Sequence, residues 1–473
     1  MNQIDIEKDQ LSLIDTRVVK CFCTIAGDHH HLTMRKCVAI ALLSFVHLLH
    51  VSYLANVDAS EAEQSAKTFD TYHGLVMTGY QGWFNAEGDG AGKRWKHYSR
   101  KGRFEPGHCT IDFWPDVSEY RQTYETPFRH ADGSAARVFS SYDASTVDLH
   151  FMWMSDYGID GAFMQRFTHS LEDSKVANHY EVVFDSAIRA AAKYNRAISI
   201  RYDLTSMREG TSQVLLDDLD RLSHRYGFHD REASPTFLYH NGKPLIAIGG
   251  VGFSDDIAGK SDVGFLREGA LLVEQLRARG YSIMLRVPAQ WRTLRGEMVV
   301  QTKDRQDRLH SIIRSCDIVM PWHVGAYREE SYVRGKWKNR IAEDIQWCRS
   351  NGIEYVSVLY PGFARANLRG GEDGSFRPRN QGSFYWFQAS SAIDVDAKML
   401  FVAQFDEMDE GTQIFKCSCR VPVGESPFVA YEAEIGTDHY LWLTGEIGKL
   451  LRGEKRFSTD LPSRLSASDG KDN

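Results

Sequence analysis

The chain has 473 residues, of which 42% are hydrophobic and 25% are charged. This composition is typical of globular proteins, and the length allows a large buried core. A formal net charge of −7 gives no general basic surface, so we expect no nucleic acid among the partners. Aromatic residues reach 12%, which suits core packing and is also a feature of clefts that bind sugars.

The segment 34–59 has the pattern of a signal peptide. Two basic residues precede an apolar run, 37–49, and small residues at 57–59 form a cleavage site. His47 and His50 make the run too short and too polar for a comfortable membrane span. We therefore predict export to the periplasm or the extracellular space.

Residues 1–33 do not resemble a targeting signal, and we predict a non-native or disordered extension there. The alternative for the apolar segment is an uncleaved anchor, and only then would the protein contact a membrane. The five cysteines after the signal form an odd set without disulfide-framework spacing: Cys109, Cys316, Cys348, Cys417 and Cys419. The last two could form a metal or redox pair, but no second pair or nearby histidine supports this. We expect neither a metal nor another cofactor in the protein.

From residue 75 onward, short apolar runs alternate with amphipathic stretches of helical period. The runs are rich in β-branched and aromatic residues, and most end in Gly, Asp, Pro or His. Eight strands are predicted in this way, at 75–81, 161–167, 197–204, 244–250, 281–287, 317–323, 354–360 and 399–405. Helices are predicted between them, for instance at 177–194, 262–280 and 332–352.

Continuous apolar strands that alternate with helices indicate a parallel sheet covered by helices. Eight of them predict an α/β fold, a (β/α)8 TIM-type barrel over 60–457 with an insertion at 85–137. A doubly wound open sheet is the alternative, but the glycines after the first strand lack the spacing of a phosphate-binding loop. The polar tail, 458–473, is predicted to be disordered.

The last predicted strand runs into a dense acidic cluster within FVAQFDEMDEG, residues 401–411. Four carboxylates, Asp406, Glu407, Asp409 and Glu410, stand at its carboxyl end, where barrel enzymes place their active sites. Crowded like charges raise the pKa of one carboxyl group and leave another ionised. Glycoside hydrolysis needs such an acid and base, and two glutamates three residues apart can point into one cavity.

Three other interpretations of the acidic cluster remain open. Dense carboxylates also bind divalent metal ions, although no histidine stands at ligand spacing. A solvated acidic loop is the simplest alternative, and a strongly apolar strand leading into it argues against that. A salt-bridge cluster with arginines at the barrel mouth is compatible with catalysis.

Other residues at strand ends are candidates for contact with a sugar. Aromatic rings stack on apolar sugar faces, and carboxylates and arginine bind hydroxyls. The candidates are Tyr80, Trp83, Asp203, Trp322, His323, Tyr360, Arg379 and Asp406. Buried structural roles are the alternative for the two tryptophans, Asp203 and His323, and Arg379 is equally able to neutralise the acidic cluster.

Four segments in order along the chain resemble glycoside hydrolase family 99, the endo-α-mannosidase type, and the wider group called 71/99-like. FDEMDEGTQI (405–414) is similar to the family's Phe-Asn-Glu-Trp-His-Glu-Gly-Thr-Gln-Ile. Weaker similarity is present in 139–163, in VSVLYPGF (356–363) and in RPRNQGSFYWFQ (377–388). The likeness spans residues 75–451.

By this resemblance, Glu407 corresponds to the carboxylate that helps the sugar's own 2-hydroxyl attack the anomeric carbon. Glu410 corresponds to the acid/base that protonates the leaving oxygen. Such enzymes retain configuration through an anhydro-sugar and need no metal. Asp406, Met408 and Asp409 stand where the family has Asn, Trp and His. The resemblance implies an α-mannan or a related glycan as the substrate. The departures lie near the substrate, so an enzyme for another sugar, xylosidase-like or arabinosidase-like, fits as well.

Two function classes follow. The first is a secreted or periplasmic, retaining glycoside hydrolase acting on an oligosaccharide or polysaccharide, with Glu407 and Glu410 as catalytic residues. The alternative is a non-catalytic carbohydrate-binding barrel, motivated by the altered residues Met408 and Asp409. A metal-dependent hydrolase is a more distant third possibility.

Overall fold

The computed structural model describes residues 68–464, except 209, 255–264, 297–298, 300–302, 327–332, 372–375 and 432–434. The predicted extension and signal peptide, 1–59, lie outside the described residues, as does the end of the predicted tail. Within the described ranges, no helix is long and apolar enough to cross a membrane.

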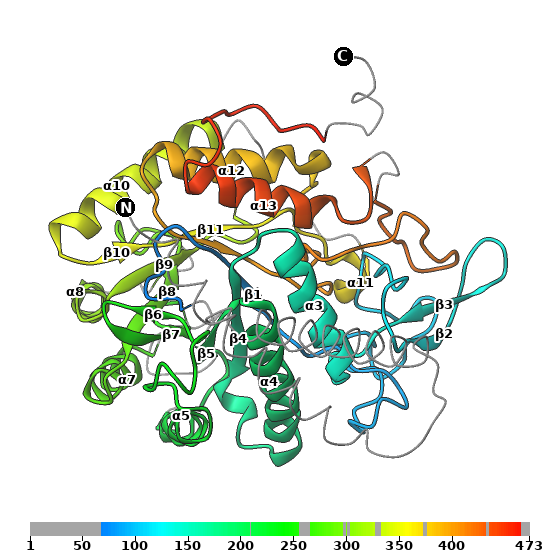
Figure 1. Ribbon diagram of the computed structural model, residues 1–473, viewed down its shortest axis with the longest axis horizontal. Coiled ribbons are helices and arrows are strands. Elements are labelled where there is room, and N and C mark those ends of the chain that lie inside the picture. Colours follow the sequence, from blue (N-terminus) through cyan, green and yellow to red (C-terminus); the bar gives the residue numbers. More distant parts are fainter. Residues whose placement is uncertain are drawn as a thin grey trace, which may run out of the picture. The chain divides into compact units, whose positions relative to one another are not determined.

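Eight parallel strands form the central barrel, which confirms the predicted fold class (Figure 1). Segment 354–359 closes the ring, because its first half pairs with one neighbour and its second half with the other. The strands are β1 (Val76–Tyr80), β4 (Gly161–Phe167), β5 (Ala197–Asp203), β7 (Lys243–Gly249), β8 (Ser282–Pro288), β9 (Ile318–Trp322), β10 (Glu354–Tyr355) with β11 (Ser357–Leu359), and β12 (Leu400–Val402). The short strand β6 (Tyr239–His240) pairs with β7 in antiparallel fashion.

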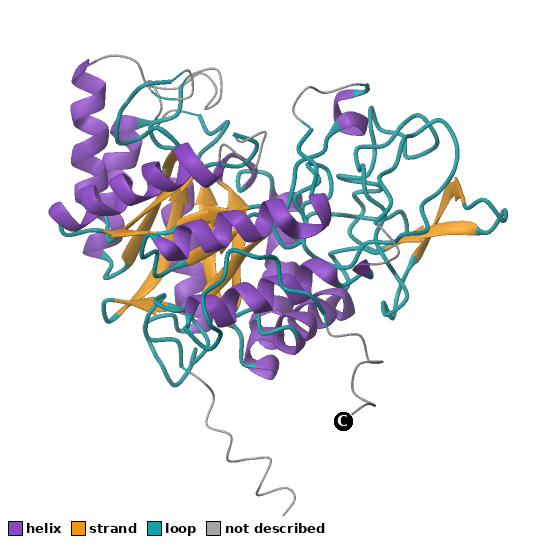
Figure 2. Cartoon of the chain, turned by 90° about the horizontal axis from the view of Figure 1, so that it is seen from above, coloured by secondary structure: helices purple, strands orange, loops and turns teal. Residues whose placement is uncertain are grey.

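Helices follow the strands and enclose the sheet (Figure 2). The longer ones are α3 (Ala144–Asp156), α4 (Ser174–Tyr194), α5 (Gln213–Tyr226), α7 (Leu266–Ala278), α8 (Lys303–Arg314), α10 (Lys338–Ser350), α12 (Ser383–Asp394) and α13 (His439–Leu451). The three helices predicted by residue range correspond to α4, α7, and the π-helix η2 (Val333–Trp337) continued by α10.

The strands are apolar along their whole length because both of their faces are buried. One face fills the barrel with side chains such as Met77, Phe163, Met284 and Phe401. The other face packs under the helices and belongs to a second, larger apolar cluster. This alternation decides which strand-end side chains reach the barrel mouth and which are buried beneath the helices.

The predicted insertion after β1 contains the antiparallel hairpin of β2 (Tyr124–Arg129) and β3 (Ala135–Val138) within mostly irregular chain. Its own aromatic core includes Phe104, Trp114 and Phe128. The carboxylate of Asp112 accepts the backbone N–H groups of Ala366 and Asn367 at 2.7 and 2.8 Å. The insertion is thereby fixed to the loop after β11.

The described part of the predicted tail, 458–464, ends in contact with α13. Arg464 Nη1 donates to Asp438 Oδ1 at 2.8 Å, and its guanidinium lies over the ring of Trp442. This end of the tail is therefore held to the barrel.

We predict that Gly445→Ala destabilises the fold. A Cβ atom at this position of α13 would lie 2.0 Å from the carbonyl oxygen of Tyr157, at the end of α3. Backbone must shift to relieve that contact, and overpacking of this kind costs about 1–3 kcal/mol. The midpoint of thermal or urea unfolding measures the loss.

Gly335→Ala is the matched control, because nothing lies within 4 Å of its would-be Cβ atom. In the helical η2 this change should be neutral or stabilise by about 0.5–1 kcal/mol. Equal stability of the two variants would contradict the close contact between α3 and α13.

Candidate active site

The acidic cluster lies on a loop that leaves β12 and folds back on itself. The N–H of Phe405 donates to the carbonyl of Gly79 on β1 at 2.8 Å, and the N–H of Thr412 donates to the carbonyl of Glu407 at 3.1 Å. Gly411 has a φ of +64°, and a Cβ atom there would lie 2.7 Å from the nitrogen of Ala364. Only glycine fits this turn, which places the carboxylates at the carboxyl ends of the strands.

Asp406 is a structural tie within the site rather than a free ligand for a sugar. It is fully buried, and its two oxygens accept the N–H groups of Gln81 and Gly82, each at 2.7 Å. Burial raises the pKa of Asp406 to about 7, although both hydrogen bonds oppose the rise. The carboxyl group therefore joins the acidic loop to the chain leaving β1.

Glu407 is the most strongly perturbed member of the cluster. Its Oε1 accepts from Gln81 Nε2 at 2.9 Å, and its Oε2 accepts from the hydroxyl of Thr412 at 3.3 Å. Burial, followed by the negative charges of Glu410 and Asp409, raises its pKa well above the usual range, and Arg201 opposes this shift. Glu407 and Glu410 thus lie close enough for their charges to repel, and this repulsion disfavours ionisation of both at once.

The four carboxylates differ in exposure. Asp406, Glu407 and Asp409 are buried, with 0%, 7% and 6% of their surface exposed, whereas Glu410 is half-buried. Asp409 Oδ2 lies 3.0 Å from Nδ1 of His97, a residue of the insertion. A buried carboxyl group beside a more open one is the environment that separates an acid from a base.

Two arginines and a tryptophan line the barrel beside the cluster. The guanidinium groups of Arg201 and Arg286 lie 5.4 and 4.8 Å from the ring of Trp322. Arg286 Nη2 donates to Asp203 Oδ2 at 2.6 Å, and Arg201 Nε donates to Gln165. The predicted residues Asp203 and Trp322 are therefore gathered near Glu407, on which the charge of Arg201 acts.

Asp203 is ionised in this setting. Its burial would raise the pKa, but the charge of Arg286 and the hydrogen bonds from Thr205 outweigh burial and lower it. The carboxylate keeps Arg286 fixed against Trp322. It therefore shapes the wall of the site through the arginine.

Three predicted residues lie away from the mouth. The hydroxyl of Tyr80 is hydrogen-bonded to His150 Nδ1 on α3 at 2.8 Å. Tyr360 packs edge-on against Phe384 of α12. His323 is fully buried, and burial lowers its pKa to about 3. The two tyrosines occupy the strand face that packs under the helices, so the structure gives them packing roles.

Arg379 holds the far side of the acidic loop. Its guanidinium donates to the carbonyls of Gly411 and Gln413 at 2.9 and 2.7 Å and to the hydroxyl of Tyr431 at 2.8 Å. Because Arg379 binds the backbone of the loop, we assign it to positioning of the carboxylates.

Trp83 lies at the mouth, stacked on two other rings. The ring of His97 is parallel to it at 4.0 Å between centroids, and Phe167 of β4 follows at 5.7 Å. Sequence patterns did not identify His97, because it lies in irregular chain without any periodic signal. Gln81, in contrast, belongs to the strand end that the sequence had already indicated.

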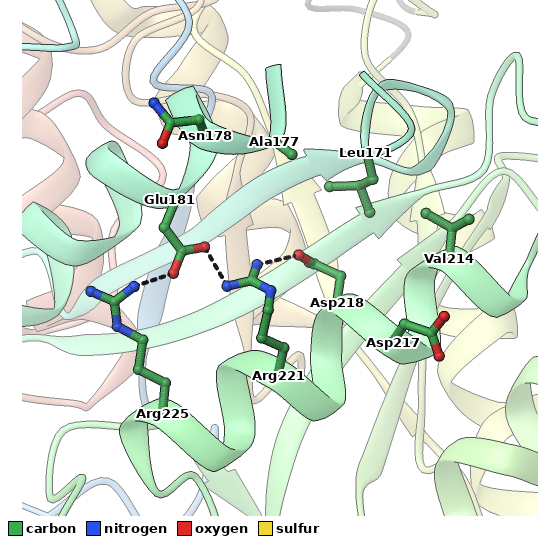
Figure 3. Close-up of a pocket in the computed structure, with 9 residues that line it drawn as sticks. All are labelled: Leu171, Ala177, Asn178, Glu181, Val214, Asp217, Asp218, Arg221 and Arg225. Carbon is green, nitrogen blue, oxygen red and sulfur yellow. Dashed lines mark hydrogen bonds and ion pairs between the residues drawn. The ribbon is translucent and has the colours of Figure 1, made fainter. Parts of the chain in front are cut away.

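The cleft between α4 and α5 is a different feature, on the outside of the barrel (Figure 3). Within it, Arg221 donates to Glu181 and Asp218 at 2.8 and 2.7 Å, and Asp218 also accepts from Arg166 of β4 at 2.7 Å. Arg166 therefore points outward, and Arg221 and Arg225 form ion pairs with Glu181 and Asp218. This cleft is not the active site.

One group of three possible metal ligands is present among the described residues, at the opposite end of the barrel: His73, His240 and Glu354. His240 Nε2 lies 2.8 Å from Glu354 Oε1, and its Nδ1 lies 3.3 Å from the backbone nitrogen of Tyr72. An N–H group can only donate, so Nδ1 of His240 accepts and Nε2 carries the hydrogen bound to Glu354. A metal on Nε2 would need that nitrogen free of hydrogen, so the geometry fits a hydrogen-bond network instead.

No family model and no curated protein matches this sequence. Two solved structures of the family 99 endo-α-mannosidase from Bacteroides thetaiotaomicron resemble the fold, one of them in complex with bis-tris propane. Their TM-scores are 0.55 and 0.56 at 15% identity, and the matches cover 82% and 81% of this chain and 99% of theirs. The chain thus has a fold like that of glycoside hydrolase family 99.

We predict that Asp406 makes the protein less stable as the pH rises from about 4 to 7. The folded state holds the Asp406 proton more tightly than an unfolded chain does, because the folded pKa is about 7 and the ordinary value is about 4. Its contribution to the free energy of unfolding therefore falls by about 1.4 kcal/mol per pH unit in this range.

Asp406→Asn removes the ionisation and isolates this effect. The difference in thermal midpoint, wild type minus variant, should decrease from pH 4 to pH 7 and then level off. Parallel curves for the two proteins would contradict the raised pKa.

Proposed function

We propose that this chain is a glycoside hydrolase that cleaves O-glycosidic bonds of an oligosaccharide or polysaccharide with retention of configuration. One observation carries the proposal: Glu407 and Glu410 are crowded together at the carboxyl end of a barrel with a family 99-like fold. Two interacting carboxyl groups that differ in burial supply the acid and the base that this reaction needs.

In the proposed reaction, Glu410 protonates the oxygen that leaves the anomeric carbon. The 2-oxygen of the same sugar attacks that carbon from the opposite face, while Glu407 removes the 2-hydroxyl proton. Water then opens the anhydro-sugar, giving its proton to Glu410, and Glu407 returns its proton to the 2-oxygen. Two inversions at one carbon produce net retention.

The proton must lie on Glu410 when the sugar reacts, although burial in the free protein favours it on Glu407. Gln81 and Thr412 donate to the Glu407 carboxylate, and the charge of Arg201 also stabilises its ionised form. A 2-hydroxyl placed against Glu407 adds another donor. These interactions support transfer of the proton to the more open Glu410.

We further propose that the protein is exported, and that its substrate is a mannan or a related glycan. Export is supported by the signal-like segment 34–59. Detection of the protein in the periplasm or medium, beginning after residue 59, would test this part independently of activity.

Glu407→Gln and Glu410→Gln test the catalytic assignment. Each should lower kcat/KM on the cleaved glycan by at least about a thousandfold, more than the loss of one ordinary hydrogen bond explains. Aryl glycosides with a good leaving group need little protonation, so they should restore much of the activity of Glu410→Gln and little of that of Glu407→Gln. NMR of the first-formed product reports retention.

Glu87→Gln is the matched control, because Glu87 is exposed and forms its ion pair with Arg94 away from the cluster. Its activity should equal that of wild type. Full turnover by both site variants would overturn the proposal. A glycan bound in calorimetry without any product over days would identify a non-catalytic binding barrel instead.

A further inference from the structure

A cavity of about 290 Å³ opens beside the acidic cluster, between the chain leaving β1, the chain leaving β4 and the start of α4. His97 joins the two regions, because it contacts Asp409 and also lines the cavity. An aromatic wall lines the same space and consists of Trp83, Phe167 and Tyr180. A sugar next to the cleaved bond would therefore extend into it.

The charge of this cavity is opposite to that of the cluster. Its positive charge comes from Lys93 and Lys96, and no carboxylate lies in the lining. The lining also contains His97, His169 and His179, and burial lowers the pKa of His179 to about 4, so that ring is neutral. In the part of the chain that the structure describes, neither lysine forms an ion pair. Lys93 is half-buried, and its partial desolvation lowers its pKa, so a compensating anion would bind it favourably.

The carboxylates nearest to the lysines are engaged elsewhere. Asp89 accepts the N–H groups of Ala86 and Ala91 at 3.1 and 2.8 Å, and it also accepts from Ser140 at 2.8 Å. Asp173 caps α4 by accepting the N–H of Lys175 at 2.9 Å. Neither lies in the lining or forms an ion pair with a lysine there, although the charges of both raise the pKa of Lys93 and so oppose the effect of its desolvation.

Two residues that line the cavity, Asn85 and Trp83, each have a buried polar atom without a hydrogen-bond partner among the described residues. Asn85 is fully buried, and its Oδ1 has no hydrogen-bond partner among the described residues, whereas its Nδ2 donates to Asp89 at 3.0 Å. The indole Nε1 of Trp83 is buried without a partner in the same part of the structure. A sugar hydroxyl satisfies Asn85, and an anionic oxygen satisfies the Trp83 N–H.

We propose that this cavity is a subsite for a sugar ring that carries an oxyanion: a carboxylate, a sulfate ester or a phosphate ester. The inference rests on the proposed function and names its substrate class, a charged glycan. Lys93, Lys96 and the Trp83 N–H bind the oxyanion, Asn85 binds a hydroxyl, and the aromatic wall covers the ring. The next ring then meets Glu407 and Glu410.

Binding is tested by calorimetry on the full chain carrying Glu410→Gln, so that no turnover interferes. The probes are the disaccharides α-mannobiose and maltose, each in four forms. One ring has a free 6-hydroxyl, carbon 6 oxidised to a carboxylate, a 6-sulfate ester or a 6-phosphate ester. At least one charged probe should bind tenfold or more tightly than its neutral counterpart, and the difference should shrink as salt rises. The charged probe with the highest affinity identifies which oxyanion the subsite binds.

Replacing Lys93 and Lys96 together by Gln should lower affinity for that charged probe by about thirtyfold or more, since bonds to charged groups are strong. Affinity for the neutral probe should change less than about threefold. Lys175→Gln is the control for the loss of a lysine charge outside the cavity, in the first turn of α4, and it should change neither affinity. Circular dichroism and the unfolding midpoint report whether the double variant is folded.

Equal binding of charged and neutral probes, or an equal loss of both in the double variant, would overturn the subsite. Failure of the enzyme proposal would give a different result. Turnover would be unchanged in the Glu407 and Glu410 variants, while affinity for the charged probes would still depend on the two lysines. The two results are therefore distinguishable.

Discussion

The site depends on one buried carboxyl group that joins two distant parts of the chain. Asp406 binds the N–H groups of Gln81 and Gly82, 325 and 324 residues away in sequence. This contact fixes the acidic loop to the chain leaving β1, and it brings the side chain of Gln81 onto Glu407. Together with the hydrogen bond from the Phe405 N–H to the Gly79 carbonyl on β1, it orients the carboxyl group that the reaction requires.

The direction of side chains at the strand ends also explains the polar residues that line the inside of the barrel. Gln165, Arg201 and Arg286 come from β4, β5 and β8, and their side chains point inward because strand residues alternate in direction. The partners offset part of the cost of burying each arginine, Gln165 for Arg201 and Asp203 for Arg286, and burial still lowers the pKa of Arg201 to about 10. The positive charge of Arg201 thereby reaches Glu407 without a direct surface salt bridge.

Much of this architecture could be predicted from the sequence, because parallel strands buried on both faces read as continuous apolar runs. The eight predicted strands and the acidic cluster correspond to the observed barrel. Tyr80 and Tyr360 were predicted to contact a sugar only because they stand at strand ends. The alternating direction of side chains along a strand places both of them under the helices instead. His97 and Lys93 lie in irregular chain, where only tertiary contacts decide which side chain reaches the site.

The acidic cluster and the basic cavity are neighbouring regions of opposite charge. The members of the acidic cluster that are ionised would repel an anionic glycan, and burial makes that repulsion stronger than it would be in water. A cationic cavity beside them holds the charged group of such a glycan to one side, behind His97, while an uncharged portion of the chain meets Glu407. The same pair of opposite charges would favour one orientation of the bound sugar over its reverse, because the reverse would place the anion against the carboxylates.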